Sequence, residues 1–184
     1  MARRAMLLCG AVCFIGLLLS GCGDDDSSSP RVDPNKVTIE SVTAAPGDHI
    51  TVDVTLHNVI SVQVVEVPIR FVGTGCTVDS VVFSPDFSMV LAPFSWTDAD
   101  PDPLEIDMIN TLLLAKSAGD YTFATIYMTI DAQAAEQTAT WQTYTYTEDQ
   151  LFGTPTLHKL SIASPSQAVA FPTFEAGTVT IVQP

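Results

Sequence analysis

The chain has 184 residues, a length typical of a single domain. Its 21 acidic residues outnumber its seven basic residues, and the formal net charge at pH 7 is −14. A surface of this sign repels the phosphate backbones of nucleic acids, so we expect no nucleic-acid partner.

The N-terminal segment has the three parts of an export signal. Arg3 and Arg4 supply positive charge, an apolar run extends to Leu19, and two small residues follow. The apolar run is shorter than the roughly 20 residues that a membrane-spanning helix needs. We therefore interpret residues 1–21 as a signal peptide that directs export.

The sequence Leu-Ser-Gly-Cys that ends at Cys22 resembles the lipobox of bacterial lipoproteins. The resemblance implies that Cys22 becomes the first mature residue and is diacylated, and two acyl chains hold a protein at a membrane where one is marginal. The alternative is an ordinary signal peptide beside a chance cysteine. We expect a lipid-anchored protein of the cell envelope, in the periplasm or at the cell surface. Whether the inner or the outer membrane holds it stays open.

Residues 22–36 form the next segment. After Cys22 they read GDDDSSSPRVDPNK and contain almost no apolar side chains. A segment of this composition cannot bury enough surface to fold, so it is predicted to be a flexible tether. The folded domain is then expected over residues 37–184.

From Val37 onward the pattern changes to the two-residue period of half-buried strands. The stretch HITVDVTLH at 49–57 alternates apolar and polar residues strictly. Before it, Pro46 and Gly47 suit the two central positions of a type II turn, the second of which needs positive φ. We predict successive strands at 37–43 and 49–57.

The next strand lies in SVQVVEVPIRFV, where the apolar phase shifts by one residue between Val64 and Val65. A β-bulge would explain the shift. Pro68 falls on the outward phase, and proline in a strand favours an edge or a bulge. Further strands are predicted at 76–83, 88–96, 104–112, 121–130, 139–147, 157–163 and 178–182. The best helical candidate, 131–137, is interpreted as a loop.

The strand at 121–130 has two candidate core faces. Tyr121, Phe123 and Tyr127 share one face, and an aliphatic set that includes Ala124 and Ile126 forms the other. We predict that the aliphatic face is buried.

About nine short strands separated by turns, without helical periodicity, predict an all-β protein. The fold class expected is a single β-sandwich or jelly roll.

Three stretches resemble cohesin domains: the opening hairpin VTIESVTAAPGDHITVDVTLHN, the strand GDYTFATIYMTI and the closing strand FEAGTVTIV. The resemblance covers nearly all of the folded part. It implies a nine-stranded jelly roll, related to carbohydrate-binding modules, in which a flat sheet face binds a calcium-loaded dockerin. The chain departs from the pattern at IRFVGTGCTVD, where cohesins commonly carry a Tyr-Asp-Pro-like segment, so no partner-binding residues are transferred.

The segment TDADPDPLEID contains Asp98, Asp100 and Asp102, and closely spaced aspartates suit a hard cation such as calcium. An EF-hand is excluded because Pro103 replaces the turn glycine and Ile109 occupies the twelfth position. The alternative is a solvated acidic loop. Glu105 and Asp107 alternate with apolar residues and are expected on the wet face of a strand.

The stretch TATWQTYTYT places Trp141, Tyr144 and Tyr146 among polar residues. The period of a strand puts Tyr144 and Tyr146 on one face and Trp141 on the other. Such rings could stack sugars or contact a protein, because they combine apolar area with a polar tip. The alternative is that they cover the edge of the sandwich.

No metalloprotease, hydrolase or phosphate-loop motif occurs in the chain. His49 and His57 lie at the two ends of one predicted strand, too far apart to share a metal ion. We therefore predict a non-catalytic binding or assembly module at the cell envelope, with a dockerin-like protein as partner. The alternatives are a carbohydrate-binding module that uses the aromatic residues, or a small glycoside-acting enzyme with paired carboxylates.

Overall fold

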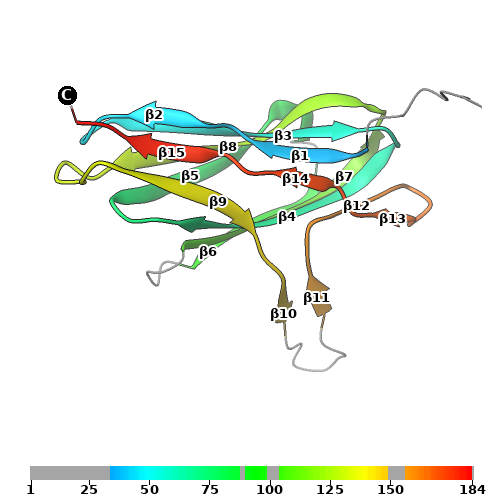
Figure 1. Ribbon diagram of the computed structural model, residues 1–184. Helices are drawn as coiled ribbons and strands as arrows, with labels where there is room; N and C mark the ends of the chain where they lie inside the picture. The colour runs from blue at the N-terminus through cyan, green and yellow to red at the C-terminus, as the bar shows by residue number, and fades with distance from the viewer. Residues whose placement is uncertain (1–33, 88–89, 99–103, 149–155, 184) are drawn as a thin grey trace, which may run out of the picture. The chain divides into compact units, whose positions relative to one another are not determined.

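A computed structural model describes residues 34–87, 90–98, 104–148 and 156–183. Cys22, Asp100 and Asp102 lie outside the described residues, and Asp98 is the last residue of a strand. The described residues form two β-sheets and a short two-stranded ribbon (Figure 1). No helix among them is long and apolar enough to cross a membrane. The predicted all-β sandwich is confirmed.

The smaller sheet has five strands, and their bounds follow in spatial order. They are β14 (Thr173–Glu175), β1 (Lys36–Ile39), β3 (His49–Asn58), β8 (Gly119–Ile130) and β5 (Cys76–Phe83). β1 pairs with β14 in parallel, and the other neighbours are antiparallel. The alternating sequence at 49–57 forms β3 as predicted, with Val52, Val54 and Leu56 buried.

The larger sheet has eight strands and is built around β4 (Val62–Val72). Its other strands are β13 (Val169–Ala170), β12 (Ser161–Ala163), β9 (Gln137–Thr143), β15 (Thr178–Ile181), β2 (Val42–Ala44), β7 (Leu104–Lys116) and β6 (Val90–Asp98). β7 pairs with one side of β4. The other side pairs first with β12 and then with β9. A 3-10 turn, η1 (Pro85–Phe87), follows β5.

Between β9 and β12 the chain leaves the larger sheet and forms the ribbon, which consists of β10 (Tyr146–Glu148) and β11 (Thr156–His158). The two strands pair antiparallel, with Tyr146 opposite His158 at the base of the ribbon. Figure 1 shows the ribbon projecting away from the sandwich. The predicted strands at 139–147 and 157–163 are therefore wrong in extent, because each is divided between the sheet and the ribbon.

The predicted strand at 37–43 is also divided in two. β1 belongs to the smaller sheet and β2 to the larger, so the chain changes sheets at Glu40 and Ser41. The Ser41 hydroxyl accepts a hydrogen bond from the backbone N–H of Thr178. Here Gly177 lies so close to the Glu40 carbonyl oxygen that an added Cβ would stand 2.3 Å from it. The crossing therefore requires glycine at 177, which alternation in the first strand does not reveal.

The phase shift predicted in β4 corresponds to an irregular register with β7 between Val62 and Val64. Val62 and Val65 are buried and Val64 is partly exposed, so the shift lies before Val64 and not, as predicted, between Val64 and Val65. Pro68, expected at an edge or bulge, is instead buried in the centre of the sheet. It lies where the neighbour of β4 changes from β12 to β9, and its carbonyl accepts a hydrogen bond from Tyr144 on that side. The proline nitrogen, which carries no N–H, faces the same side. No regular ladder passes Pro68 on that side, so no ladder hydrogen bond is lost.

The face prediction for β8 holds only in part. Ala124 and Ile126 are buried as expected, but Phe123 is buried as well, and Tyr127 is exposed. The register between β3 and β8 shifts at Val54 and Thr55, so that Phe123 is passed over in the pairing and turns inward. One extra residue changes the face of every residue that follows it.

Candidate functional site

The outer face of the larger sheet carries a polar cluster at the base of the ribbon. Alternation in β4 buries Val65 and Val67 in the core and turns Glu66 outward. On β7 the same alternation turns Asp107 outward between buried Ile106 and Met108. The base of the ribbon covers both carboxylates, so this part of the outer face is not open to solvent.

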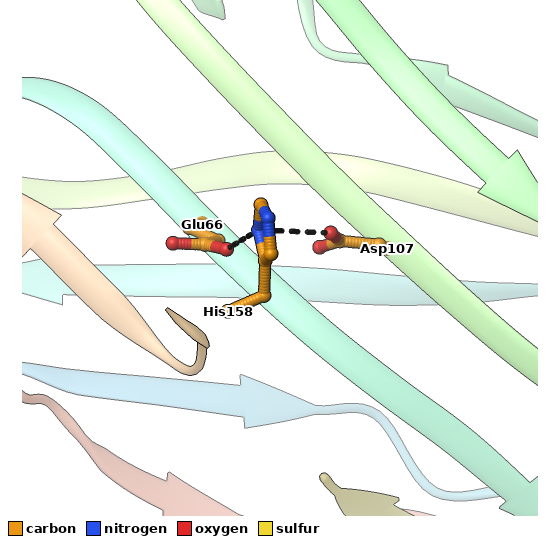
Figure 2. Close-up of side chains that lie close together, drawn as sticks. All are labelled: Glu66, Asp107 and His158. Carbon is orange, nitrogen blue, oxygen red and sulfur yellow. Dashed lines mark hydrogen bonds and ion pairs between the residues drawn. The ribbon is translucent and has the colours of Figure 1, made fainter. Parts of the chain in front are cut away.

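Four side chains make up the cluster, which we call the ribbon cluster: Glu66, Asp107, Tyr146 and His158. The Tyr146 hydroxyl donates a short hydrogen bond to Oδ2 of Asp107. Nδ1 of His158 lies 2.6 Å from Oε1 of Glu66 and 3.9 Å from Oδ2 of Asp107. The imidazole therefore stands between the two carboxylates (Figure 2). The Ser161 hydroxyl donates to Oε2 of Glu66 over 3.3 Å.

The aromatic rings of the ribbon continue this arrangement. Tyr146 stacks on the His158 ring, with 4.6 Å between centroids and planes 10° apart. Tyr144 also stacks on Tyr146, with a centroid separation of 5.5 Å. The two tyrosines share a face, as predicted. The stack fixes the plane of the imidazole and holds the ribbon against the sheet.

Burial sets the electrostatics of the ribbon cluster. The side chains of Asp107, His158 and Glu66 are 0%, 11% and 15% exposed. Burial raises the pKa of Glu66, the hydrogen bond from His158 opposes that rise, and the charge of Asp107 adds to it. Burial, followed by the hydrogen bond to Asp107, also raises the pKa of Tyr146 well above its ordinary value. Tyr146 therefore remains a protonated donor at neutral pH.

The structure does not support the expected surface position of Trp141. Its side chain is fully buried and packs against Phe71, with 4.8 Å between ring centroids. In β9, Ala139 and Trp141 point inward while Gln142 points to solvent. The polar residues of this stretch are the ones that point outward. The alternation of Ala139 and Trp141 with threonine indicates that these two side chains are buried. A buried ring cannot stack on a sugar.

The prediction that Asp107 lies on a solvated strand face is also wrong, because the ribbon covers its side chain completely. The other members of the ribbon cluster that the sequence did not indicate are Glu66 and His158, which lie 92 positions apart. No local motif joins them, since β4, β7 and β11 become neighbours only when the sheet and the ribbon form. The calcium site predicted at Asp98, Asp100 and Asp102 stays a prediction.

The arrangement limits the chemistry that the carboxylates can perform. One oxygen from each of Glu66 and Asp107 lies within 4.8 Å of the other and of a His158 nitrogen. A glycosidase needs such a pair on the two sides of an accessible sugar. Asp107 is fully covered, so this pair cannot reach a polysaccharide. Two carboxylates and an imidazole are, however, common ligands of metal ions.

The outer face of the smaller sheet is different and is called here the threonine face, after Thr51, Thr55, Thr122, Thr125 and Thr129. These residues point outward on β3 and β8. Three of the hydroxyls contact neighbouring polar groups: Thr55 donates to the Thr38 carbonyl, Thr125 donates to Asp53, and Thr129 contacts His49. His49 and His57 lie at opposite ends of β3, as expected from the sequence.

No family model matches the chain, and no curated protein matches it either. Solved structures do. The cohesin of a type I cohesin–dockerin complex from Clostridium thermocellum has a TM-score of 0.64 at 18% identity, over 82% of this chain and 100% of that one. The fold is cohesin-like.

Two further solved structures agree with the cohesin-like fold. The seventh type I cohesin of ScaB from Pseudobacteroides cellulosolvens has a TM-score of 0.62 at 13% identity, over 82% of this chain and 93% of that one. A non-cellulosomal cohesin from the archaeon Archaeoglobus fulgidus has a TM-score of 0.54 at 14% identity, over 81% and 91%. At this identity the likeness concerns the fold, and side-chain roles have to be argued from this chain itself.

Proposed function

We propose that this protein is a non-catalytic, lipid-anchored binding module that holds a protein partner of the dockerin kind on a sheet face. The observation that carries the proposal is the cohesin-like sandwich. Several of the similar solved structures are cohesins in complex with dockerins. We infer the binding mode from that likeness and the binding face from the residues of this chain.

The outer face of the larger sheet is the better candidate for the binding face. It presents Arg70, whose Nη2 donates to Oε1 of Gln142 over 3.2 Å, and the partly exposed rings of Tyr144 and Tyr146. Leu157 on the ribbon is 55% exposed. Tyrosine and arginine are enriched at protein interfaces, where they contribute much of the binding energy. The threonine face offers mainly short side chains, and the hydroxyls of Thr55, Thr125 and Thr129 already have partners.

Lipid attachment at Cys22 gives the module its place at the membrane. The 15 residues from Cys22 to Lys36 span at most about 50 Å when fully extended. The excess of acidic residues opposes adsorption of the domain to anionic lipids. The acyl chains therefore supply the membrane contact, and the sheet faces remain available to a partner.

Partner binding is tested with a panel of calcium-loaded dockerin modules from the same organism, measured by calorimetry. We expect at least one to bind, and Arg70→Ala or Tyr144→Ala to weaken it about tenfold or more, as for central interface residues. Tyr127→Ala is the matched control, because Tyr127 is an exposed tyrosine on the threonine face. Binding that depends on Tyr127 and not on Tyr144 would place the interface on the other sheet.

Lipid attachment has its own test. Cys22→Ala should abolish metabolic labelling with palmitate in the bacterial host. Labelling that persists in this variant would contradict the anchor while leaving the binding proposal intact.

Carbohydrate binding is the second candidate function, favoured by the stacked rings of Tyr144, which precedes the ribbon, and Tyr146, at its base. A glycan array separates it from the first candidate. Sugar binding that is lost in both Tyr144→Ala and Tyr146→Ala, with no dockerin bound, would replace the protein partner by a polysaccharide.

A further inference from the structure

The geometry of the ribbon cluster points to a binding site for one divalent first-row transition-metal ion, with Glu66, Asp107 and His158 as its protein ligands. Zn²⁺ is the probe with which we define the site. This inference goes beyond the proposed partner binding and does not depend on it.

The three ligand atoms are already gathered at nearly the required separations. The donor atoms of Glu66, Asp107 and His158 all lie within 4.8 Å of one another. In a tetrahedral zinc site with bonds of about 2.0–2.1 Å, neighbouring ligand atoms are about 3.3 Å apart. The distances from Nδ1 of His158 to the two carboxylates, 2.6 Å and 3.9 Å, lie on either side of that value. The two His158 contacts would each have to change by less than 1 Å to admit the ion, and the two carboxylate oxygens, which lie within 4.8 Å of each other, would have to move together.

The charges of the ribbon cluster favour a cation at the same position. Two carboxylates face each other across one imidazole nitrogen (Figure 2). A divalent ion at this position would neutralise both negative charges. Because Asp107 is fully buried and Glu66 nearly so, an uncompensated charge there is costly.

Neighbouring groups hold the carboxylates in place from outside. Tyr146 donates to Asp107, and Ser161 donates to Glu66. Such outer hydrogen bonds orient metal-bound carboxylates. The ring of Tyr146 stacks on His158 and restricts rotation of the imidazole. The site is therefore preorganised, which lowers the cost of binding.

The ligand set selects among metals. One imidazole nitrogen with two carboxylates suits zinc and its first-row neighbours. Calcium takes six to eight oxygen ligands and magnesium keeps most of its waters, so neither fits this enclosed, nitrogen-containing cluster. Because the ligands come from β4, β7 and β11, a bound ion would link the ribbon to two strands of the larger sheet.

The test titrates Zn²⁺ into the full-length chain and its variants by calorimetry and follows thermal unfolding of the same samples. We expect saturable binding with a ribbon-cluster component and a rise in Tm. His158→Ala should remove this component, and Glu66→Gln, which keeps the shape of the side chain, should weaken it by at least about tenfold. His57→Ala is the matched control, because His57 also contacts a carboxylate, Asp120, at 2.7 Å, but at an exposed site.

Co²⁺ absorption provides a second readout and a check on the cysteines of the chain. We expect visible bands typical of nitrogen and oxygen ligands that disappear in both ribbon-cluster variants. Circular dichroism confirms that each variant is folded. Zinc binding that is absent, that is unchanged in His158→Ala and Glu66→Gln, or that shows sulfur-to-cobalt charge transfer as its only signal would overturn the proposal. In those cases the ribbon cluster is a hydrogen-bonded contact between ribbon and sheet.

Discussion

Two histidine–carboxylate contacts, one on each sheet, have nearly the same length and opposite surroundings. His158 and Glu66 approach to 2.6 Å with side chains 11% and 15% exposed. His57 and Asp120 approach to 2.7 Å on the threonine face, with side chains 30% and 84% exposed. An exposed pair contributes about 0–1 kcal/mol because water screens it. In the buried pair, loss of one partner leaves a charge without compensation. The two contacts have similar lengths, so the difference in burial determines how much each contributes to stability.

The largest expected effect is that of His158→Ala. Removing the imidazole leaves Glu66 and Asp107 facing each other under the ribbon, so we expect the free energy of unfolding to fall by about 3 kcal/mol. Urea denaturation with a chelator present measures the loss without a contribution from bound metal. His57→Ala should cost less than about 1 kcal/mol. Equal losses in the two variants would show that burial does not distinguish the pairs.

Tyr146→Phe should have the next largest effect. The hydroxyl donates to the buried carboxylate of Asp107, and hydrogen bonds to charged groups contribute about 2 kcal/mol. The ring and its stack on His158 are retained, so the variant isolates the hydrogen bond. Tyr127→Phe serves as the control, since Tyr127 is 41% exposed on the threonine face. A loss no larger than that of the control would mean that water replaces the hydroxyl at Asp107.

The exposed pair should respond to salt in a way that the buried pair does not. A double-mutant cycle over His57 and Asp120 is expected to give a coupling of less than about 1 kcal/mol that vanishes in 1 M salt. The corresponding cycle over His158 and Glu66 should retain most of its coupling. Parallel loss of both couplings in salt would indicate that the ribbon opens to solvent.

The smallest expected effect concerns Glu175, at the edge of the smaller sheet. The hydrogen bond of 3.0 Å that Lys36 donates to Glu175, together with the Lys36 charge, lowers the pKa of this carboxyl. The pair therefore stabilises the fold above the ordinary glutamate pKa, and the contribution disappears as the pH falls through the lowered value. An NMR titration should give a midpoint below that of an ordinary glutamate, and Lys36→Met should restore it. A midpoint that Lys36→Met leaves unchanged would contradict the assignment.

Some strands could be predicted from their own residues. The alternation of HITVDVTLH predicted β3, and residues 76–83 form β5 as expected. The two-residue period arises because successive side chains of an extended chain point to opposite faces. Neighbouring residues alone are therefore enough to reveal it. The sandwich class follows from many such segments, each of which has one apolar face to bury.

Other features needed the partner strands. Phe123 is inside because β8 shifts register against β3. The division of 139–147 between β9 and β10 follows from the departure of the ribbon, which no residue pattern marked. Register and pairing are relations between distant segments, so a single segment does not contain them.

The sequence by itself determined the strand-forming pattern, the sandwich class, the acidic surface and the Leu-Ser-Gly-Cys signature at Cys22. Only the tertiary structure decided that Glu66, Asp107 and His158 meet beneath the ribbon and that Asp107 is buried there. The physical reason is that apolar alternation acts between neighbours in the chain. A polar cluster instead depends on which strands become adjacent in the sheet and on what then covers them.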